Sequence, residues 1–327
     1  MIVAVLLAGA VLAAVHHAEV VAHRVGEPYG SLILAVAVTV IEVGLIVTLM
    51  VSGGDHTSTL ARDTVFAATM ITCNGVVGLS LLVGSLREHV VPFRAEGTSA
   101  ALATVATLAT LTLVLPTFTT STPGPQFSGA QLAFAAVASL ALYLLFVFVQ
   151  TVRHRDYFLP EAPGETDPDA HAAPPTDRHA ITSLVVLVVA LVAVVGLAKI
   201  ESKPIEDAVD AAGAPQSAVG VVIALLVLMP ETLAAYRNAA RGRVQISLNL
   251  AYGSAMASIG LTIPTIAIAS IWLEPPLELG LGPTQIVLLA ITVLVGALSV
   301  PLGRATLQQS GIRLVLFAAF VFLSVFP

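Results

Sequence analysis

Ten apolar stretches divide this chain of 327 residues, and each is long enough to cross a lipid bilayer. A membrane-spanning helix needs about 20 consecutive, predominantly apolar residues. The stretches cover approximately residues 2–22, 31–51, 62–86, 99–116, 130–151, 181–200, 217–236, 244–272, 284–301 and 311–326. Charged residues make up only 10% of the chain, against about 25% in a soluble domain. The sequence therefore predicts an all-α membrane protein of about ten transmembrane helices. It excludes a soluble binding protein, and we expect the lipid bilayer as a partner and no nucleic acid.

Basic residues lie mainly on one side of this predicted topology. The odd-numbered loops carry eleven arginines: Arg24, Arg87, Arg94, Arg153, Arg155, Arg178, Arg237, Arg241, Arg243, Arg304 and Arg313. The other side has three basic residues, Arg62, Lys199 and Lys203. Because loops rich in lysine and arginine stay in the cytoplasm, we expect the odd-numbered loops to be cytoplasmic and both termini to lie outside.

A carboxylate inside the seventh apolar stretch is the feature that most directly suggests function. Glu231 follows Pro230 directly. An acidic side chain at the centre of a membrane costs roughly 2.5–3.5 kcal/mol on insertion scales, so it is expected to face a wet cavity or a bound ion. Proline also removes a helix hydrogen bond and frees a carbonyl about one turn earlier. Freed carbonyls are tolerated at this depth where they line a cavity or pack within protein.

The two halves of the chain repeat one pattern. The first and sixth spans end with three residue pairs at a constant offset of 187, namely Glu19 with Glu206, Gly26 with Gly213 and Pro28 with Pro215. Glu42 corresponds to Glu231 at an offset of 189. Because each half holds five spans, an odd number, the halves must lie in opposite orientations. Inverted repeats with a site at their interface are a common plan of secondary transporters. We expect a first five-helix repeat at 1–151, a cytoplasmic linker rich in acidic residues and proline at 152–180, and a second five-helix repeat at 181–327.

Each repeat supplies one carboxylate and, on its next span, a neutral oxygen ligand. The first repeat offers Glu42 and Asn74, and the second offers Glu231 and Ser254. Carboxylates, amide carbonyls and hydroxyls are the ligands that Ca²⁺ prefers. These four residues are the predicted metal ligands. Each also has a structural explanation, because a buried carboxylate or amide can bond a neighbouring helix and a serine can simply pack.

Further residues are candidates for the margin of this site or for an ion pathway. They are Thr39, Gly75, Pro230, Asn249, Gly253, Glu19 and Glu206. For the last two, a solvated acid at a helix end is an equally ordinary explanation. The fourth and fifth spans, between residues 99 and 151, are expected to serve as scaffold.

Three functional classes were compared on these residues. A cation/proton antiporter fits paired acids in inverted repeats. A channel would more usually build a ring or filter of ligands, and no filter-like loop occurs in the sequence. A membrane protease would need a constellation such as HExxH, which is absent. We therefore expect a transporter and not an enzyme.

Several long motifs resemble one known family. They are HHAEVVAHRVGEPYG, TVIEVGLI, TLARDTVFAATMITCNGVVG, GAPQSAVG, PETLAA and GSAMASIGLTIP. They resemble the bacterial calcium/proton antiporters of the cation/calcium exchanger superfamily, in its sodium-potassium/calcium–proton branch. The resemblance covers most of the chain outside the central linker.

This resemblance implies two inverted five-helix repeats around a site at the middle of the membrane. The family's glutamates look like Glu42 and Glu231, and its Gly-Ser pair looks like Gly253 and Ser254, with Asn74 at the position of a small polar ligand. The resemblance also implies exchange of Ca²⁺ for H⁺ by alternating access in the bacterial cytoplasmic (inner) membrane, without a cofactor. Na⁺ or K⁺ would use similar oxygens, so exchange of a monovalent cation for protons remains open.

Overall fold

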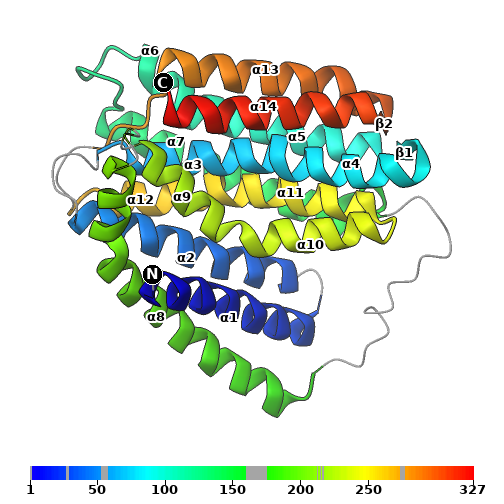
Figure 1. Cartoon of the computed structure of the whole chain (residues 1–327), viewed down its shortest axis with the longest axis horizontal. Helices are drawn as coiled ribbons and strands as arrows, with labels where there is room; N and C mark the ends of the chain where they lie inside the picture. The colour runs from blue at the N-terminus through cyan, green and yellow to red at the C-terminus, as the bar shows by residue number, and fades with distance from the viewer. Residues whose placement is uncertain are drawn as a thin grey trace.

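The computed structural model describes residues 2–26, 29–52, 58–159, 175–211, 213, 215, 217–272 and 277–327. The described residues form long helices that run in a bundle, with one pair of short strands at one end (Figure 1). Most of the predicted linker, together with Pro28, lies outside the described residues.

The helices of the first half are α1 Ile2–Val25, α2 Tyr29–Ser52, α3 Leu60–Met70, α4 Val77–Glu88, α5 Ala95–Ala109, α6 Leu115–Phe118 and α7 Gly129–Phe148. Those of the second half are α8 Asp177–Ala211, α9 Ser217–Val227, α10 Met229–Ala240, α11 Val244–Gly260, α12 Thr262–Ala269, α13 Pro283–Ser299 and α14 Leu307–Val325. Three π-helical segments, Ile71–Val76, Thr110–Val114 and Val149–Arg153, join or extend helices of the first half.

These helices build the predicted spans. Eight described helices, counted through their π-helical segments, are long and apolar enough to cross a membrane, and α9 with α10 forms a ninth span bent by 51°. The tenth is α2, which has 24 residues and an apolar part at Val36–Val51. The chain is therefore an all-α membrane protein with the helices expected from its sequence.

The two halves are inverted relative to each other. Arg24, at the end of α1, forms a salt bridge with Asp177, at the start of α8. The two helices pack along each other, and the end of α1 meets the start of α8, so they run antiparallel. Because α1 is the first helix of one half and α8 the first helix of the other, the two halves have opposite orientations. Gly26 and Gly213, the matched glycines after these helices, both have a left-handed backbone, with φ of 78° and 68°. Glycine adopts this conformation readily and commonly ends a helix in this way.

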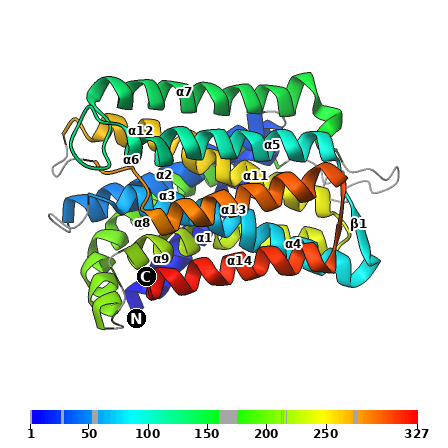
Figure 2. The ribbon, with the colours of Figure 1, turned by 90° about the horizontal axis from the view of Figure 1, so that it is seen from above.

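Two apolar cores lie side by side in the bundle. One joins α1, α2, α8 and α9, and the other joins α4, α5, α7, α10, α11 and α14. α11 lies at the centre, where it packs against α4, α5, α7 and α10. In Figure 2, α7 and α14 form opposite margins of the molecule, with α5, α11 and α13 between them.

The strands support the predicted topology. β1, Val90–Pro92, pairs antiparallel with β2, Arg304–Thr306. The two strands belong to the third and ninth loops, which the ten-span topology places on one side of the membrane. Both termini lie at the opposite end of the bundle (Figure 1).

One arginine was misplaced by the count of loop charges. Arg313 lies inside α14 and is only 1% exposed, because its side chain turns into the protein between helices. The odd-numbered side therefore has ten basic residues at or near its loops, and the bias remains.

Candidate functional site

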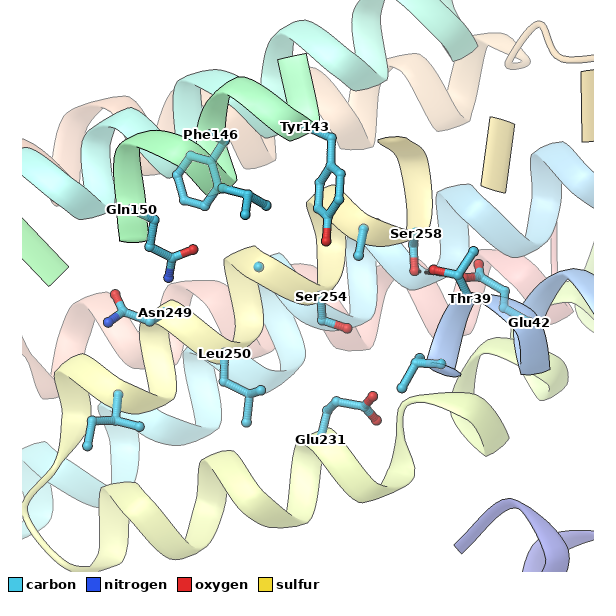
Figure 3. A pocket seen from close by; sticks show the side chains of 15 residues that line it. Thr39, Glu42, Tyr143, Phe146, Gln150, Glu231, Asn249, Leu250, Ser254 and Ser258 are labelled. Atoms are coloured by element: carbon cyan, nitrogen blue, oxygen red, sulfur yellow. Dashed lines mark hydrogen bonds between the residues drawn. The ribbon is translucent and has the colours of Figure 1, made fainter. Parts of the chain in front are cut away.

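A cavity of about 270 Å³ lies at the centre of the bundle, between α2, α7, α10 and α11 (Figure 3). Its polar lining comes from all four helices: Thr39, Glu42, Tyr143, Gln150, Glu231, Asn249, Ser254 and Ser258. The cavity thus brings together the two predicted carboxylates, one from each repeat.

Glu42 is anchored from the opposite repeat. It lies in the middle of α2 and is 2% exposed. Ser258 Oγ donates to Glu42 Oε2 at 3.0 Å, and Thr262 Oγ1 donates to the same oxygen at 3.2 Å. The other oxygen, Oε1, is buried without a hydrogen-bond partner in the described structure. One carboxylate oxygen is therefore fixed, and the other is left for a ligand.

Glu231 lies in the first turn of α10, just after the 51° bend. Pro230 occupies the start of α10, where its missing N–H costs no helix hydrogen bond. The bend turns the positive end of the α10 dipole toward this carboxylate, which favours negative charge there. Glu231 is 8% exposed, and its Oε2 has no hydrogen-bond partner among the described residues. It lies close enough to Glu42 for the two carboxylates to interact electrostatically.

The two carboxylates are presented differently. α2 continues without a break through Glu42, whereas the equivalent span of the second repeat is broken between Val227 and Met229. Proline explains the difference, because the first repeat has Ile41 where the second has Pro230.

The remaining predicted residues divide into two groups. Thr39, Asn249, Gly253 and Ser254 line the cavity with the carboxylates. Asn74 is fully buried outside this lining, where its Nδ2 donates to Thr292 Oγ1 at 2.9 Å and its Oδ1 has no hydrogen-bond partner within the described chain.

Two other predicted residues, Gly75 and Glu19, are not among the residues that line the cavity. Gly75 packs beneath the ring of Phe317. Glu19, on α1, interacts with His16 and Arg237, and it adds to the negative field at Glu231. Glu206 belongs to α8, but its side chain lies outside the described part of the structure.

The expectation that the fifth span is only scaffold was wrong. α7 lines the cavity through Tyr143, Phe146 and Val147, and the π-helical segment that follows it adds Gln150. Tyr143 reaches the cavity because α7 approaches α11 at Gly260, where an added Cβ would lie 2.6 Å from the Tyr143 Cβ. Figure 3 shows the Tyr143 hydroxyl directed toward Ser254 and Ser258.

The sequence analysis also missed Ser258 and Thr262, the two residues that hold Glu42. Ser254, Ser258 and Thr262 recur at intervals of four along one helix face. That spacing was the available signal. It could not show that the face meets Glu42, because the contact joins the two repeats.

The arrangement suits a cation held by two carboxylates and neutral oxygens. Within the described ranges, no three His, Cys, Asp or Glu side chains come together as a metal-binding group. A hard cation here would therefore combine the carboxylates of Glu42 and Glu231 with hydroxyls, carbonyls or water.

The cavity extends from the carboxylates toward one end of the bundle. Along α11 its lining runs from Ser258 to Ile246, a rise of about 18 Å. Ile246 follows shortly after the turn at Arg241–Arg243, which precedes α11. The cavity therefore extends toward the end that carries the basic loops.

The family is decided by a match over nearly the whole chain. Residues 1–152 and 182–326 match the model of the sodium/calcium exchanger protein family. The chain belongs to this family. Residues 153–181, between the two matched segments, lie outside the match.

Individual relatives agree with this assignment. The chain is 47% identical over 322 residues to y4hA of Sinorhizobium fredii (strain NBRC 101917 / NGR234), named as an ionic transporter, covering 98% of this chain and 87% of the relative. It is 34% identical over 308 residues to the sodium-potassium/proton antiporter ChaA of Escherichia coli (strain K12), and the match covers 94% of this chain and 83% of ChaA. The protein is thus a multi-pass membrane transporter of the exchanger family.

Solved structures share the fold. YfkE superposes with a TM-score of 0.73 at 16% identity, covering 98% of this chain and 90% of YfkE. The H⁺/Ca²⁺ exchanger CAX superposes with a TM-score of 0.70 at 16% identity, covering 97% of this chain and 80% of CAX. The fold is therefore the inverted five-helix repeat of the exchanger superfamily.

Proposed function

We propose that this protein exchanges Ca²⁺ for protons across the membrane at the cavity between Glu42 and Glu231. The observation that carries the proposal is that each repeat directs one buried carboxylate into the same cavity, and each carboxylate retains an oxygen without a hydrogen-bond partner in the described structure. A transport site must also release its ion, so we expect the protein to supply only part of the ion's coordination shell.

Charge balance explains how the exchange would be coupled. Two carboxylates in a low-dielectric site need two positive charges, supplied either by one Ca²⁺ or by two protons. Metal binding requires the deprotonated carboxylates, so Ca²⁺ and protons compete for the same oxygens. The pair titrates as a unit because Glu42 and Glu231 interact. Competition of this kind makes uptake of one ion depend on release of the other.

The neutral ligands follow from the cavity lining. Ser254 lines the cavity on α11 and lies above Glu231 in Figure 3. Under this proposal Asn74 binds the ion in a second conformational state, through the Oδ1 that has no hydrogen-bond partner in the described structure. The path to the site is formed by Thr39, Asn249, Gly253 and Gln150. The margin of the site is formed by Gly75, Pro230, Glu19 and Glu206.

Alternating access sets the direction of the path. With the basic, odd-numbered loops in the cytoplasm, the cavity described here faces the cytoplasm of a bacterial cell and the protein resides in the inner membrane.

Exchange of Na⁺ or K⁺ for protons is the second candidate. It is favoured by the Escherichia coli relative, which is named as a sodium-potassium/proton antiporter and aligns with 94% of this chain. The same two carboxylates would serve, with each monovalent cation replacing one proton.

Proton flux in everted membrane vesicles separates the candidates. A pH gradient is established, followed with a pH-sensitive dye, and challenged in turn with Ca²⁺, Na⁺ and K⁺. Dissipation by Ca²⁺ at lower concentrations than Na⁺ or K⁺ supports the proposal, whereas dissipation by Na⁺ or K⁺ alone supports the second candidate. A gradient that none of the three cations dissipates contradicts both.

A further inference from the structure

A second, very small cavity lies on the opposite face of α11 from the cation site. Its volume is about 10 Å³, which accommodates one particle of roughly the size of a water molecule. Its polar lining consists of Thr98 on α5, Tyr252 on α11, Ser299 on α13, and Gln309 and Arg313 on α14. No carboxylate occurs among its described lining residues.

Three hydrogen-bonding atoms of this lining are buried without a hydrogen bond of normal geometry in the described structure, although the Tyr252 hydroxyl lies beside the Arg313 guanidinium. The three atoms are Thr98 Oγ1, Tyr252 Oη and Arg313 Nε. Their residues are 2%, 1% and 1% exposed. Unpaired buried polar groups are rare because each costs about 1–3 kcal/mol. Three around a single cavity indicate that a ligand belongs there.

The charge of Arg313 distinguishes the kind of ligand. Its Nη1 donates to the Cys73 carbonyl at 2.9 Å, and its Nη2 donates to Ser299 Oγ at 3.2 Å. Both acceptors are neutral, and the salt bridges found among the described residues do not involve Arg313. Guanidinium groups remain protonated in proteins, and an uncompensated charge at membrane depth is costly. The site therefore requires negative charge as well as a hydrogen-bond acceptor.

We propose that this cavity binds a single small anion of the size of chloride. The anion would accept hydrogen bonds from the Thr98 and Tyr252 hydroxyls and from Arg313 Nε–H. It would also neutralise the guanidinium, which a water molecule does not. The anion is bound and not transported, because the cavity is separate from the cation cavity and shares no lining residue with it.

The position of the site connects it with the transport machinery. On α11, Leu248 and Tyr252 line the anion cavity, whereas Asn249 and Gly253 line the cation cavity. Arg313 also holds the carbonyl of Cys73, the residue before Asn74. A bound anion would hold in place the face of α11 opposite the cation site. It would also maintain the hydrogen bond from Arg313 to Cys73 in the π-helical segment Ile71–Val76.

Thermal unfolding of the purified full-length protein tests this proposal. The melting temperature is measured in potassium chloride and in potassium gluconate at equal ionic strength. We expect chloride to raise it in a saturable manner, since a ligand that binds the folded state stabilises it, and bromide to replace chloride. Thr98→Val and Tyr252→Phe each remove one donor but no charge, and we expect each to weaken the apparent chloride affinity by roughly tenfold.

Two matched variants serve as controls. Thr104→Val removes an exposed hydroxyl from the same helix as Thr98, and Tyr236→Phe removes one from an exposed ring. Both should retain the full response to chloride. The same melting temperature in both salts for the wild type would show that the cavity holds only water. An undiminished chloride response in Thr98→Val and Tyr252→Phe would show that chloride binds outside this cavity, as an adventitious ion only. Either outcome would overturn the proposal.

Discussion

Ser258, on α11 of the second repeat, donates a 3.0 Å hydrogen bond to Glu42, on α2 of the first repeat. The bond joins the two repeats at the carboxylate proposed to bind the cation. It holds one oxygen of Glu42 in place, while the other is buried without a hydrogen-bond partner in the described structure. The relative position of the repeats and the geometry of the cation site are therefore coupled through this contact.

Removing this hydroxyl should weaken cation binding. Ser258→Ala deletes a hydrogen bond to a charged group, and such bonds contribute about 1.5–3 kcal/mol, so we expect the KM for Ca²⁺ to rise by roughly tenfold or more. Vesicle assays over a range of Ca²⁺ concentrations measure the change. Ser270→Ala is the matched control, because the hydrogen bond described for the Ser270 hydroxyl goes to the Ala267 carbonyl of its own helix region. Equal KM values for the two variants would contradict the role of Ser258.

Two glycines of α11 should respond differently to substitution. An added Cβ at Gly253, which lines the cavity, meets no neighbouring atom of the described structure within 4 Å, whereas an added Cβ at Gly260 lies 2.6 Å from the Tyr143 Cβ. We expect Gly253→Val to reduce transport by at least about tenfold with little change in melting temperature. Gly260→Ala should instead destabilise the fold by about 1–3 kcal/mol. Full transport by Gly253→Val would show that ions do not pass this face.

Asn74 can be tested against its hydrogen-bond partner. Asn74→Ala and Thr292→Val both break the 2.9 Å bond between these residues, but only the first removes Oδ1. If Oδ1 is an ion ligand in a second state, Asn74→Ala raises the KM for Ca²⁺ by roughly tenfold, and Thr292→Val leaves it near the wild-type value. Equal effects of both variants on the KM would assign Asn74 to packing only.

The pH dependence of transport should reflect competition at the carboxylates. A fall in pH adds protons to the groups that must be deprotonated to bind Ca²⁺, so the KM for Ca²⁺ should rise as the pH falls. Where both carboxylates take up protons, the rise approaches about a hundredfold per pH unit, or tenfold per proton displaced. Initial rates in proteoliposomes with equal pH on both sides measure this. A KM independent of pH would exclude a shared site.

The sequence was sufficient to predict the spans, the inverted repeats and the two carboxylates. Their signals are local: apolar stretches of membrane length, a matched pair of glycines, and acidic residues where lipid would exclude them. Pro230 was expected only to free a carbonyl, and the structure shows in addition that the span breaks there, with Glu231 in the first turn of α10. Each of these features is set by residues close together in the sequence and does not depend on how distant helices pack.

The partners of the carboxylates could not be predicted in the same way. Ser258 and Thr262 meet Glu42, and Tyr143 and Gln150 reach the cavity, through packing between helices that are distant in sequence. Uncharged side chains in apolar spans give no indication of which helix face meets a cavity. Arg313 was misassigned for a related reason, since its position near a span end suggested a loop, whereas its side chain is buried.

Proton release on cation binding is the most direct test of the central claim that Glu42 and Glu231 bind Ca²⁺ and protons alternately. Calorimetric titration of the purified protein with Ca²⁺, in buffers with different ionisation enthalpies, counts the protons released. The account predicts release approaching about two protons per Ca²⁺ at a pH where both carboxylates are protonated. It also predicts loss of Ca²⁺ binding in the Glu42→Gln, Glu231→Gln double variant. Ca²⁺ binding without proton release, or unchanged binding in the double variant, would contradict it.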